Sequence, residues 1–291
     1  MIEVLEPGPL TTVQDLGRPG YADLGVARAG AFDRGALRLA NRLVGNRPDA
    51  AGLEVTFGGL AVRFTDPATV AFTGAPAPGA PDWQVAVTLP AGTVVRLGRP
   101  SSGLRSYLAV RGGLAVPATL GSRSTDTLSG LGPAPLRAGD RLPVGSVTGD
   151  VTGTVGAAAS RPAVVPVVPG PRDDWFTARA NQLLVAAAWT VRAESDRVGI
   201  RLAGPVLDRA HGGELPSEPT LPGAIQVPPD GRPIVFGPDA PVTGGYPVIA
   251  VATDLDALAQ LRPGDEVRFV RRGSGAGSPT TARPPRPQPA W

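Results

Sequence analysis

Glycine and proline most limit what this chain can fold into. The 291 residues include 39 glycines and 34 prolines, together about a quarter of the chain. Neither residue recurs with a fixed period, which excludes a collagen-like triple helix. The strongly apolar runs between them argue against wholesale disorder. Turn-forming residues at this density favour many short strands over long helices.

Short apolar runs between the turn residues predict the strands. We expect them at residues 60–64, 69–72, 85–89, 94–97, 105–110, 200–202, 234–236 and 267–270. Helical signals are few. They predict a helix over 32–43 stopped by Gly45, one from Asp173 or Asp174 to about 184, and a short one from Asp254 to 261. The pattern therefore predicts a mainly β fold of barrel architecture with a few short helices, rather than a doubly wound α/β sheet.

Two low-complexity stretches divide the chain. Residues 145–160 are rich in Gly, Thr, Val and Ala and predict a linker or long loop. Residues 272–291 are rich in Gly, Ser and Pro and predict a disordered tail. We therefore expect an N-terminal β unit over 1–144 and a C-terminal β unit over 161–271.

A repeated pattern supports the expectation of two units. Residues 136–142 and 261–267 share a Gly-Asp turn that leads into an alternating strand. Such turns are common in barrels, so a duplication and a chance recurrence explain the pattern equally well.

The residue types that are missing exclude several kinds of site. With no cysteine, the chain can form neither disulfides nor thiolate metal sites, and this usage fits a reducing cytoplasm. All 28 basic residues are arginine, so there is no Walker lysine, no Schiff-base lysine and no biotinyl-lysine. We expect no covalently bound cofactor. The single histidine, His211, is too few for a His-rich metal site, and a Ser-His-Asp triad could be built only there; the ligands of any metal stay unknown.

Charge and hydropathy bear on the partners. The net charge is +3, but four arginines lie after residue 270 and no acid does, which leaves about −1 for the rest. The folded body therefore lacks the clustered positive charge of a nucleic-acid surface. The N-terminus has no signal-peptide pattern, and no apolar run approaches the roughly 20 residues of a membrane span. We expect a soluble, cytoplasmic protein that binds neither nucleic acid nor membrane.

Residues 12–21 (TVQDLGRPGY) form the first segment that could carry chemistry. Gln14, Asp15 and Arg18 place an amide, a carboxylate and a guanidinium within five residues, followed by turn formers. A rigid loop of this kind suits an anionic or planar substrate. Alternatively, Asp15 and Arg18 pair with each other and only fasten the turn.

Two further segments are rich in polar groups. Residues 121–127 (GSRSTDT) include Arg123 and Ser124 and could bind phosphate or carboxylate, or could be an ordinary polar hairpin loop. Residues 217–247 end in TGGYP, where Gly244 and Gly245 would let a ligand approach the backbone and Tyr246 offers an aromatic face, although the same letters suit a plain bulge before a strand.

Taken in order, these segments resemble the biotin-dependent carboxyltransferase-like family, also called allophanate hydrolase subunit 2. The resemblance covers about residues 2–270. It is carried by TVQDLGRPGY (12–21), AGAFD (29–33), LANRLVGN (39–46), LEVTFGG (53–59), RSYLAVRGGL (105–114), GSRST (121–125), SDRVGIRL (195–202), GAIQVPPDG (223–231) and TGGYP (243–247).

The resemblance implies a cyclophilin-like β-barrel and a subunit of an ATP-dependent 5-oxoprolinase. Such a subunit is expected to be inactive without its B-type and A-type partners, with which it would phosphorylate 5-oxoproline for ring opening to L-glutamate. ATP, together with Mg²⁺, would be the cofactor. The matching positions imply catalytic roles for Asp15, Arg18, Arg123, Arg197 and Glu218. They imply substrate-binding roles for Gln14, Ser124, Gln226, Asp230, Asp239, Thr243 and Tyr246.

Departures from the family pattern keep other functions open. Members often read DxQTTGGYP, whereas residues 239–247 lack the Gln and one Thr, and Glu218 is followed by Pro219 where Gly is usual. One alternative is a carboxyltransferase component that receives carboxyl groups from biotin on another protein. The other is a non-catalytic regulator that binds a kinase-inhibitor partner.

Overall fold

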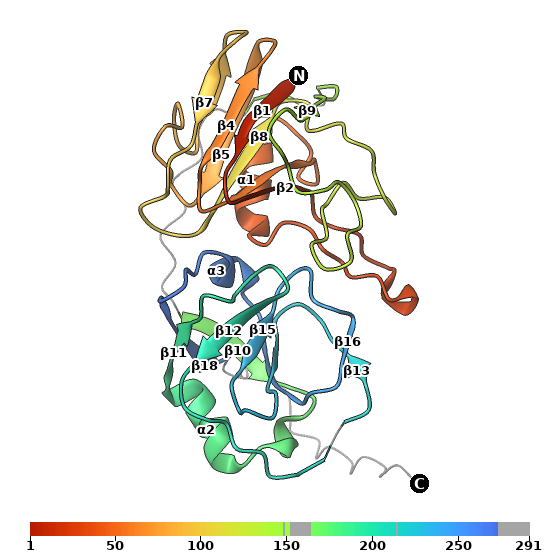
Figure 1. Ribbon diagram of the computed structural model, residues 1–291, viewed down its shortest axis with the longest axis vertical. Coiled ribbons are helices and arrows are strands. Elements are labelled where there is room, and N and C mark those ends of the chain that lie inside the picture. Colours follow the sequence, from red (N-terminus) through yellow and green to blue (C-terminus); the bar gives the residue numbers. More distant parts are fainter. Residues whose placement is uncertain (148, 152–163, 214, 273–291) are drawn as a thin grey trace.

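Two antiparallel sheets and one helix form the N-terminal half of the computed structural model, which describes residues 1–147, 149–151, 164–213 and 215–272 (Figure 1). One sheet has the strand order β7-β4-β1-β9 and the other β2-β3-β8-β5-β6. The elements are β1 (Ile2–Pro7), β2 (Leu10–Gln14), the 3-10 turn η1 (Ala22–Leu24), α1 (Arg34–Leu43), β3 (Gly52–Thr56), β4 (Leu60–Phe64), β5 (Ala68–Gly74), β6 (Ala86–Leu89), β7 (Val94–Arg96), β8 (Arg105–Val110) and β9 (Arg141–Leu142).

The two sheets share one apolar core. Ile2 and Val62 from the first sheet belong to the same buried cluster as Leu53 and Phe72 from the second. On the other face of the second sheet, Leu43 of α1 packs in a separate buried cluster with residues of β5 and β8. The N-terminal half is thus a sandwich with α1 on one outer face.

The C-terminal half contains a closed barrel in the order β10-β17-β14-β15-β12-β11-β18, with a parallel pairing of β10 and β18 completing the ring. Trp189, fully buried, belongs to the barrel core and donates its indole N–H to the carbonyl of Leu184 at 3.0 Å. The elements are β10 (Val164–Pro169), η2 (Asp173–Trp175), α2 (Ala178–Ala186), β11 (Ala188–Val191), β12 (Gly199–Ala203), β13 (Glu218–Pro219), β14 (Ala224–Gln226), β15 (Ile234–Phe236), β16 (Thr243–Gly244), β17 (Val248–Ala252), α3 (Leu255–Ala259) and β18 (Glu266–Arg271). Outside the barrel, β13 pairs with β16.

The mainly β fold with a barrel and few helices is confirmed, and each predicted strand is present within about two residues. Asp33 caps α1 and Asp254 caps α3, each by accepting a backbone N–H three residues on. The prediction for α2 was wrong at its start. Thr177, not Asp173 or Asp174, accepts the N–H of Ala180; the two aspartates lie in η2, and the extended backbone at Phe176 separates that turn from the helix.

The repeated Gly-Asp pattern folds the same way in both halves. Asp140 accepts the N–H of Arg137 at 2.7 Å, and Asp265 accepts the N–H of Arg262 at 2.8 Å. In each turn the glycine has a left-handed backbone, with φ of 91° at Gly139 and 90° at Gly264. The two turns lead into β9 and β18, so the recurrence is structural as well as sequential.

The predicted linker and tail fall mostly outside the described residues. The predicted tail, apart from Arg272, and most of the predicted linker lie outside the described residues, so the boundaries 1–144, 145–160, 161–271 and 272–291 stay predictions. Within the described part of the chain, no helix has the length and apolar character needed to cross a membrane.

Helix termini and one aromatic side chain join the two halves. Asp256 of α3 accepts the N–H groups of Arg34 and Gly35, at 2.9 and 3.1 Å, at the start of α1. Phe32, just before α1, is buried in the same cluster as the barrel core. The guanidinium of Arg105 stacks over the Phe32 ring at 4.4 Å from its centre. Phe32, a residue of the N-terminal half, therefore completes the packing of the C-terminal barrel.

Replacing this aromatic residue should test the coupling. We expect Phe32→Ala to lower the free energy of unfolding by about 3–5 kcal/mol, because it leaves a cavity between the halves. Leu24→Ala, at a side chain that is 69% exposed, should leave stability unchanged. Urea unfolding measures both; a Phe32→Ala cost as small as that of the Leu24 control would contradict the packing described.

Candidate functional site

A buried arginine connects acids from the two halves. Arg197, in the loop before β12, donates from Nε and Nη2 to both oxygens of Asp239, each at 2.8 Å. Its Nη1 donates to Glu54 of β3, and its Nη2 also donates to the carbonyl of Gly30 at 2.7 Å. These three ionic side chains are at most 1% exposed. The network therefore crosses from the barrel to the sandwich without contact with water.

Glu54 is satisfied on all sides. Its Oε2 accepts the Phe32 N–H at 2.9 Å and the Tyr107 hydroxyl at 2.7 Å, and its Oε1 lies 3.4 Å from Nε of Arg105. Burial alone would raise the pKa of Glu54, but the charges of Arg197 and Arg105, with these hydrogen bonds, hold it below its ordinary value of 4.5. Burial would likewise lower the pKa of Arg197, but Glu54 and Asp239 raise it above its usual range. Glu54 and Arg197 are therefore both charged at neutral pH.

Asp15 organises residues 119–131, which we call the serine loop. Its Oδ1 accepts the hydroxyls of Ser122 and Ser124 at 2.6 Å, and its Oδ2 accepts the N–H of Arg123 at 2.6 Å. Further along the same loop, the N–H and hydroxyl of Thr127 donate to Asp239 at 2.9 and 2.7 Å. One loop is therefore held by an aspartate from each half.

Arg18 and Gln14 also hold this loop, through hydrogen bonds to its carbonyl groups. Arg18, 1% exposed, donates to the carbonyls of Thr119 and Ser124. Gln14 donates to the carbonyl of Thr125 at 3.0 Å. The predicted alternative, an Asp15–Arg18 pair, is not what holds the turn, since each residue binds the serine loop instead.

Several buried polar atoms in and around the serine loop have no hydrogen-bond partner among the described residues. Five buried side-chain polar atoms within the described ranges have no partner, and three belong to this cluster: Gln14 Oε1, Arg18 Nη1 and Thr125 Oγ1. Buried polar groups are normally satisfied, so such atoms mark a place where a water or a ligand atom completes the arrangement.

Four of the remaining predicted residues fall into a second group on the barrel side. Glu218 on β13 forms an ion pair with Arg172. Gln226 on β14 donates to the Tyr246 carbonyl at 2.8 Å, while the Tyr246 side chain is 46% exposed. Thr243 lies on β16, paired with β13.

The structure thus gathers seven of the twelve predicted residues around the serine loop and places four near β13 and β16. The seven are Gln14, Asp15, Arg18, Arg123, Ser124, Arg197 and Asp239. Asp230 joins neither group; it lies exposed in a turn, where it accepts the Arg232 N–H at 3.1 Å. The chemical roles of all twelve stay predictions. Glu54, Arg105 and Tyr107 were missed, although a glutamate inside the apolar strand 53–56 was a usable signal.

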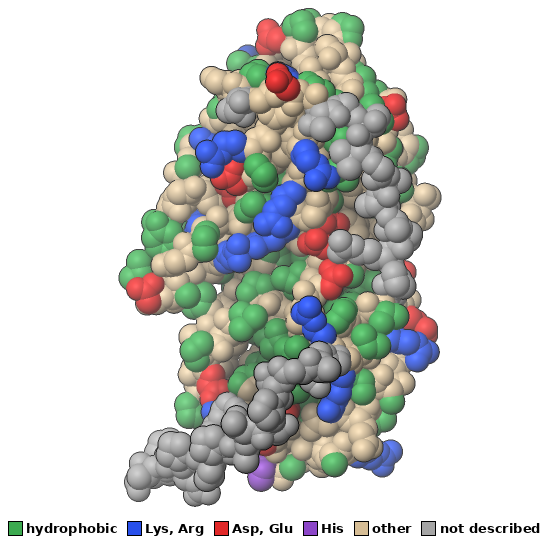
Figure 2. All heavy atoms as spheres, turned by 180° about the vertical axis from the view of Figure 1, so that it is seen from behind, with side chains coloured by type: hydrophobic (Ala, Val, Ile, Leu, Met, Phe, Trp, Pro, Cys, Tyr) green, Lys and Arg blue, Asp and Glu red, His purple; other side chains and the backbone are tan. Residues whose placement is uncertain are grey.

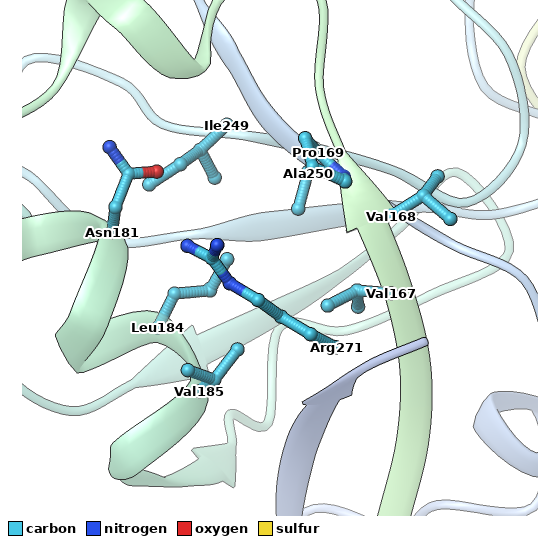
Figure 3. Close-up of a pocket in the computed structure, with 9 residues that line it drawn as sticks. All are labelled: Val167, Val168, Pro169, Asn181, Leu184, Val185, Ile249, Ala250 and Arg271. Atoms are coloured by element: carbon cyan, nitrogen blue, oxygen red, sulfur yellow. The ribbon is translucent and has the colours of Figure 1, made fainter. Parts of the chain in front are cut away.

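Two hollows of the described chain lie away from these residues. Figure 3 shows one beside Arg271, whose guanidinium points toward Asn181 and Leu184; with a cavity volume of about 10 Å³ it has room for about one water. A wider depression of about 410 Å³ is lined by residues including Trp83 and Arg99. No cluster of three or more His, Asp or Glu suited to a metal occurs among the residues that the structure describes.

The buried network makes a pH-dependent contribution that can be measured. Glu54→Gln should lower the free energy of unfolding by about 3–5 kcal/mol at neutral pH, because it leaves the buried guanidinium groups of Arg197 and Arg105 without the carboxylate that they share. The difference from wild type should vanish as pH falls through the folded-state pKa of Glu54, below 4.5, since protonation removes the same attraction. Urea unfolding over a pH series measures this. A difference that stays constant into that acid range would contradict the network, and Glu194→Gln, at an exposed pair with Arg192, serves as the unaffected control.

Comparison with known proteins identifies the family to which this architecture belongs. The family described as carboxyltransferase domain, subdomain A and B, matches residues 24–271. The chain is 39% identical to the C-type subunit of 5-oxoprolinase from Escherichia coli (strain K12), over 93% of this chain and 91% of that protein.

Solved structures agree with this match. The crystal structure of TTHA0988 matches with a TM-score of 0.82 and 38% identity over 92% of this chain, which spans 55% of that one. The K. lactis urea amidolyase structure matches with a TM-score of 0.87 and 30% identity over 94% of this chain, which spans 19% of that one. The chain belongs to the carboxyltransferase domain, subdomain A and B, family, as its sequence motifs predicted.

Proposed function

We propose that this chain is the C-type subunit of an ATP-dependent 5-oxoprolinase. The observation that carries the proposal is correspondence over nearly full length: the chain spans 91% of the E. coli C-type 5-oxoprolinase subunit but 19% of the urea amidolyase chain. The match therefore extends over nearly all of the E. coli subunit but over only a small part of urea amidolyase. With B-type and A-type partners, it would take part in the hydrolysis of 5-oxoproline to glutamate.

The proposed reaction first transfers the γ-phosphoryl group of ATP to the lactam oxygen of 5-oxoproline, which releases ADP. Water then opens the activated ring, giving glutamate and phosphate. Phosphoryl transfer depends on positioning and on charge stabilisation by arginines and Mg²⁺. In the described chain the acids of the candidate site are occupied by protein donors, which supports a site completed by a partner protein.

The three buried polar atoms without a partner, on the serine loop and on the residues that hold it, suit this substrate. A lactam presents an N–H donor and a carbonyl acceptor on adjacent atoms. Gln14 Oε1 can accept from the N–H, and Arg18 Nη1 and Thr125 Oγ1 can donate to the oxygen. We propose that these three atoms recognise the lactam once the partner is in place.

Carboxyl transfer is the second candidate function. It is favoured by the family match itself and by the TM-score of 0.87 to urea amidolyase. Because the chain contains no lysine, the biotin would have to be carried by another protein.

Thr125→Val separates a substrate contact from a structural role. Valine has nearly the shape of threonine, and the buried Thr125 hydroxyl has no partner among the described residues, so thermal stability should be unchanged or raised. We expect 5-oxoproline-dependent ADP release by the complex with B-type and A-type partners to fall about tenfold.

Thr73→Val supplies the matched control. The Thr73 hydroxyl donates to the Ala36 carbonyl at 2.7 Å, away from the serine loop, so its loss should lower stability and leave turnover per folded complex unchanged. Wild-type complex that releases ADP without regard to 5-oxoproline would overturn the proposed function. Carboxyl transfer from a biotinylated carrier would then favour the second candidate.

A further inference from the structure

Arginines gather in and before helix α1 with few acids among them. Residues 24–45 contain four arginines and a single acid, Asp33, which is used as the helix cap. Arg34, Arg38 and Arg42 are four residues apart, so they follow one side of the helix. Arg38 and Arg42 are exposed and Arg34 is half-buried. On the rear face of the molecule, Figure 2 shows basic side chains in an oblique row across the N-terminal half.

Arg28 and Arg38 both lie near enough to Arg34 for their charges to act on it. Arg34 is anchored, since its Nη2 donates to the Leu16 carbonyl at 3.2 Å. Burial, followed by the charges of Arg28 and Arg38, lowers the pKa of Arg34 to about 10. An anion bound beside Arg34 would offset the repulsion that Arg28 and Arg38 exert on it. We call Arg28, Arg34 and Arg38 the arginine cluster.

The neighbouring acids are engaged elsewhere. Asp15 and Asp256 are the carboxylates whose charges act on Arg34. Asp15 binds the serine loop, and Asp256 accepts the backbone N–H groups of Arg34 and Gly35. Neither the Arg28 nor the Arg38 guanidinium has a hydrogen bond or an ion pair with any residue that the structure describes. Their donors are therefore available to a ligand.

The cluster also adjoins the candidate site. The carbonyl of Arg28 accepts the N–H of Arg18 at 2.7 Å, which ties the cluster to the loop that carries Asp15. Arg18 and Arg197, for which the family resemblance implied catalytic roles, are buried and donate to protein acceptors. Exposed arginines beside the site are better placed to reach a phosphate chain.

We propose that the arginine cluster binds the phosphate chain of a nucleoside triphosphate at the edge of the serine-loop site. This inference rests on the proposed function and names the side of the site where the nucleotide would lie. Polyphosphate suits the cluster because its charges are spaced along a chain and each guanidinium can donate two parallel hydrogen bonds. An acidic segment of a partner protein is the competing occupant.

Calorimetric titration of the full chain with tripolyphosphate at low ionic strength tests the proposal. We expect saturable binding that Arg28→Gln/Arg38→Gln weakens about tenfold or more, because charge-assisted hydrogen bonds are lost. The matched control is Arg137→Gln/Arg141→Gln, which removes the same charge from two exposed arginines, one in the turn before β9 and one at its start. It should bind like wild type, and thermal unfolding should show all three proteins folded.

Three outcomes would overturn the phosphate site. The first is no binding by the wild-type chain. The second is equal weakening in both double variants, which would show a general charge effect. The third is unaltered tripolyphosphate binding with loss of co-purification with the B-type partner in Arg28→Gln/Arg38→Gln, which would make the cluster a protein-docking surface. Because this titration uses one chain and no 5-oxoproline, it can succeed or fail independently of the turnover assay.

Discussion

The guanidinium of Arg197 lies between Glu54 of the sandwich and Asp239 in the barrel half, with about 1% of these side chains exposed. Removing three charges from water is costly, and the cost is offset only when nearly every donor and acceptor finds a partner. Here the backbone of Gly30 and Phe32 and the hydroxyl of Tyr107 supply the remaining partners. The two halves can satisfy these groups only in one relative position, so the network fixes how they pack.

That fixed position shapes the candidate site. Asp239 binds Arg197 through both oxygens and also holds Thr127, while Asp15 holds the other end of the serine loop. The loop is thus tied to both halves, and three buried polar atoms without a partner belong to it or to the residues that hold it. The arginine cluster lies on α1 and in the segment before it, and the start of α1 is tied to the barrel half through Asp256. The groups proposed to meet the lactam and the phosphate chain therefore depend on the same packing of the two halves.

Local sequence predicted the elements better than it predicted their pairing. Alternating apolar runs located β4 and β15 to the residue, and Asp33 and Asp254 were readable as caps because the capping bond is local. The ion pair of Glu54 with Arg197 spans 143 residues, and no local pattern contains it. The sequence motifs named Arg197 and Asp239 but not their common role, and Glu54 was overlooked inside an apolar strand. The barrel order likewise depends on long-range pairing such as β10 with β18.

Hydrogen exchange of wild type and Asp239→Asn is the most direct measurement of whether the buried network holds the site in place. The asparagine side chain has one acceptor oxygen where aspartate has two. It therefore cannot accept hydrogen bonds from both Arg197 nitrogens and from Thr127, as the carboxylate does. We predict that amides of residues 119–131 exchange much faster in the variant, while those of β3, β8 and the barrel strands keep their protection. Unchanged protection of the serine loop would contradict the claim that the network positions it.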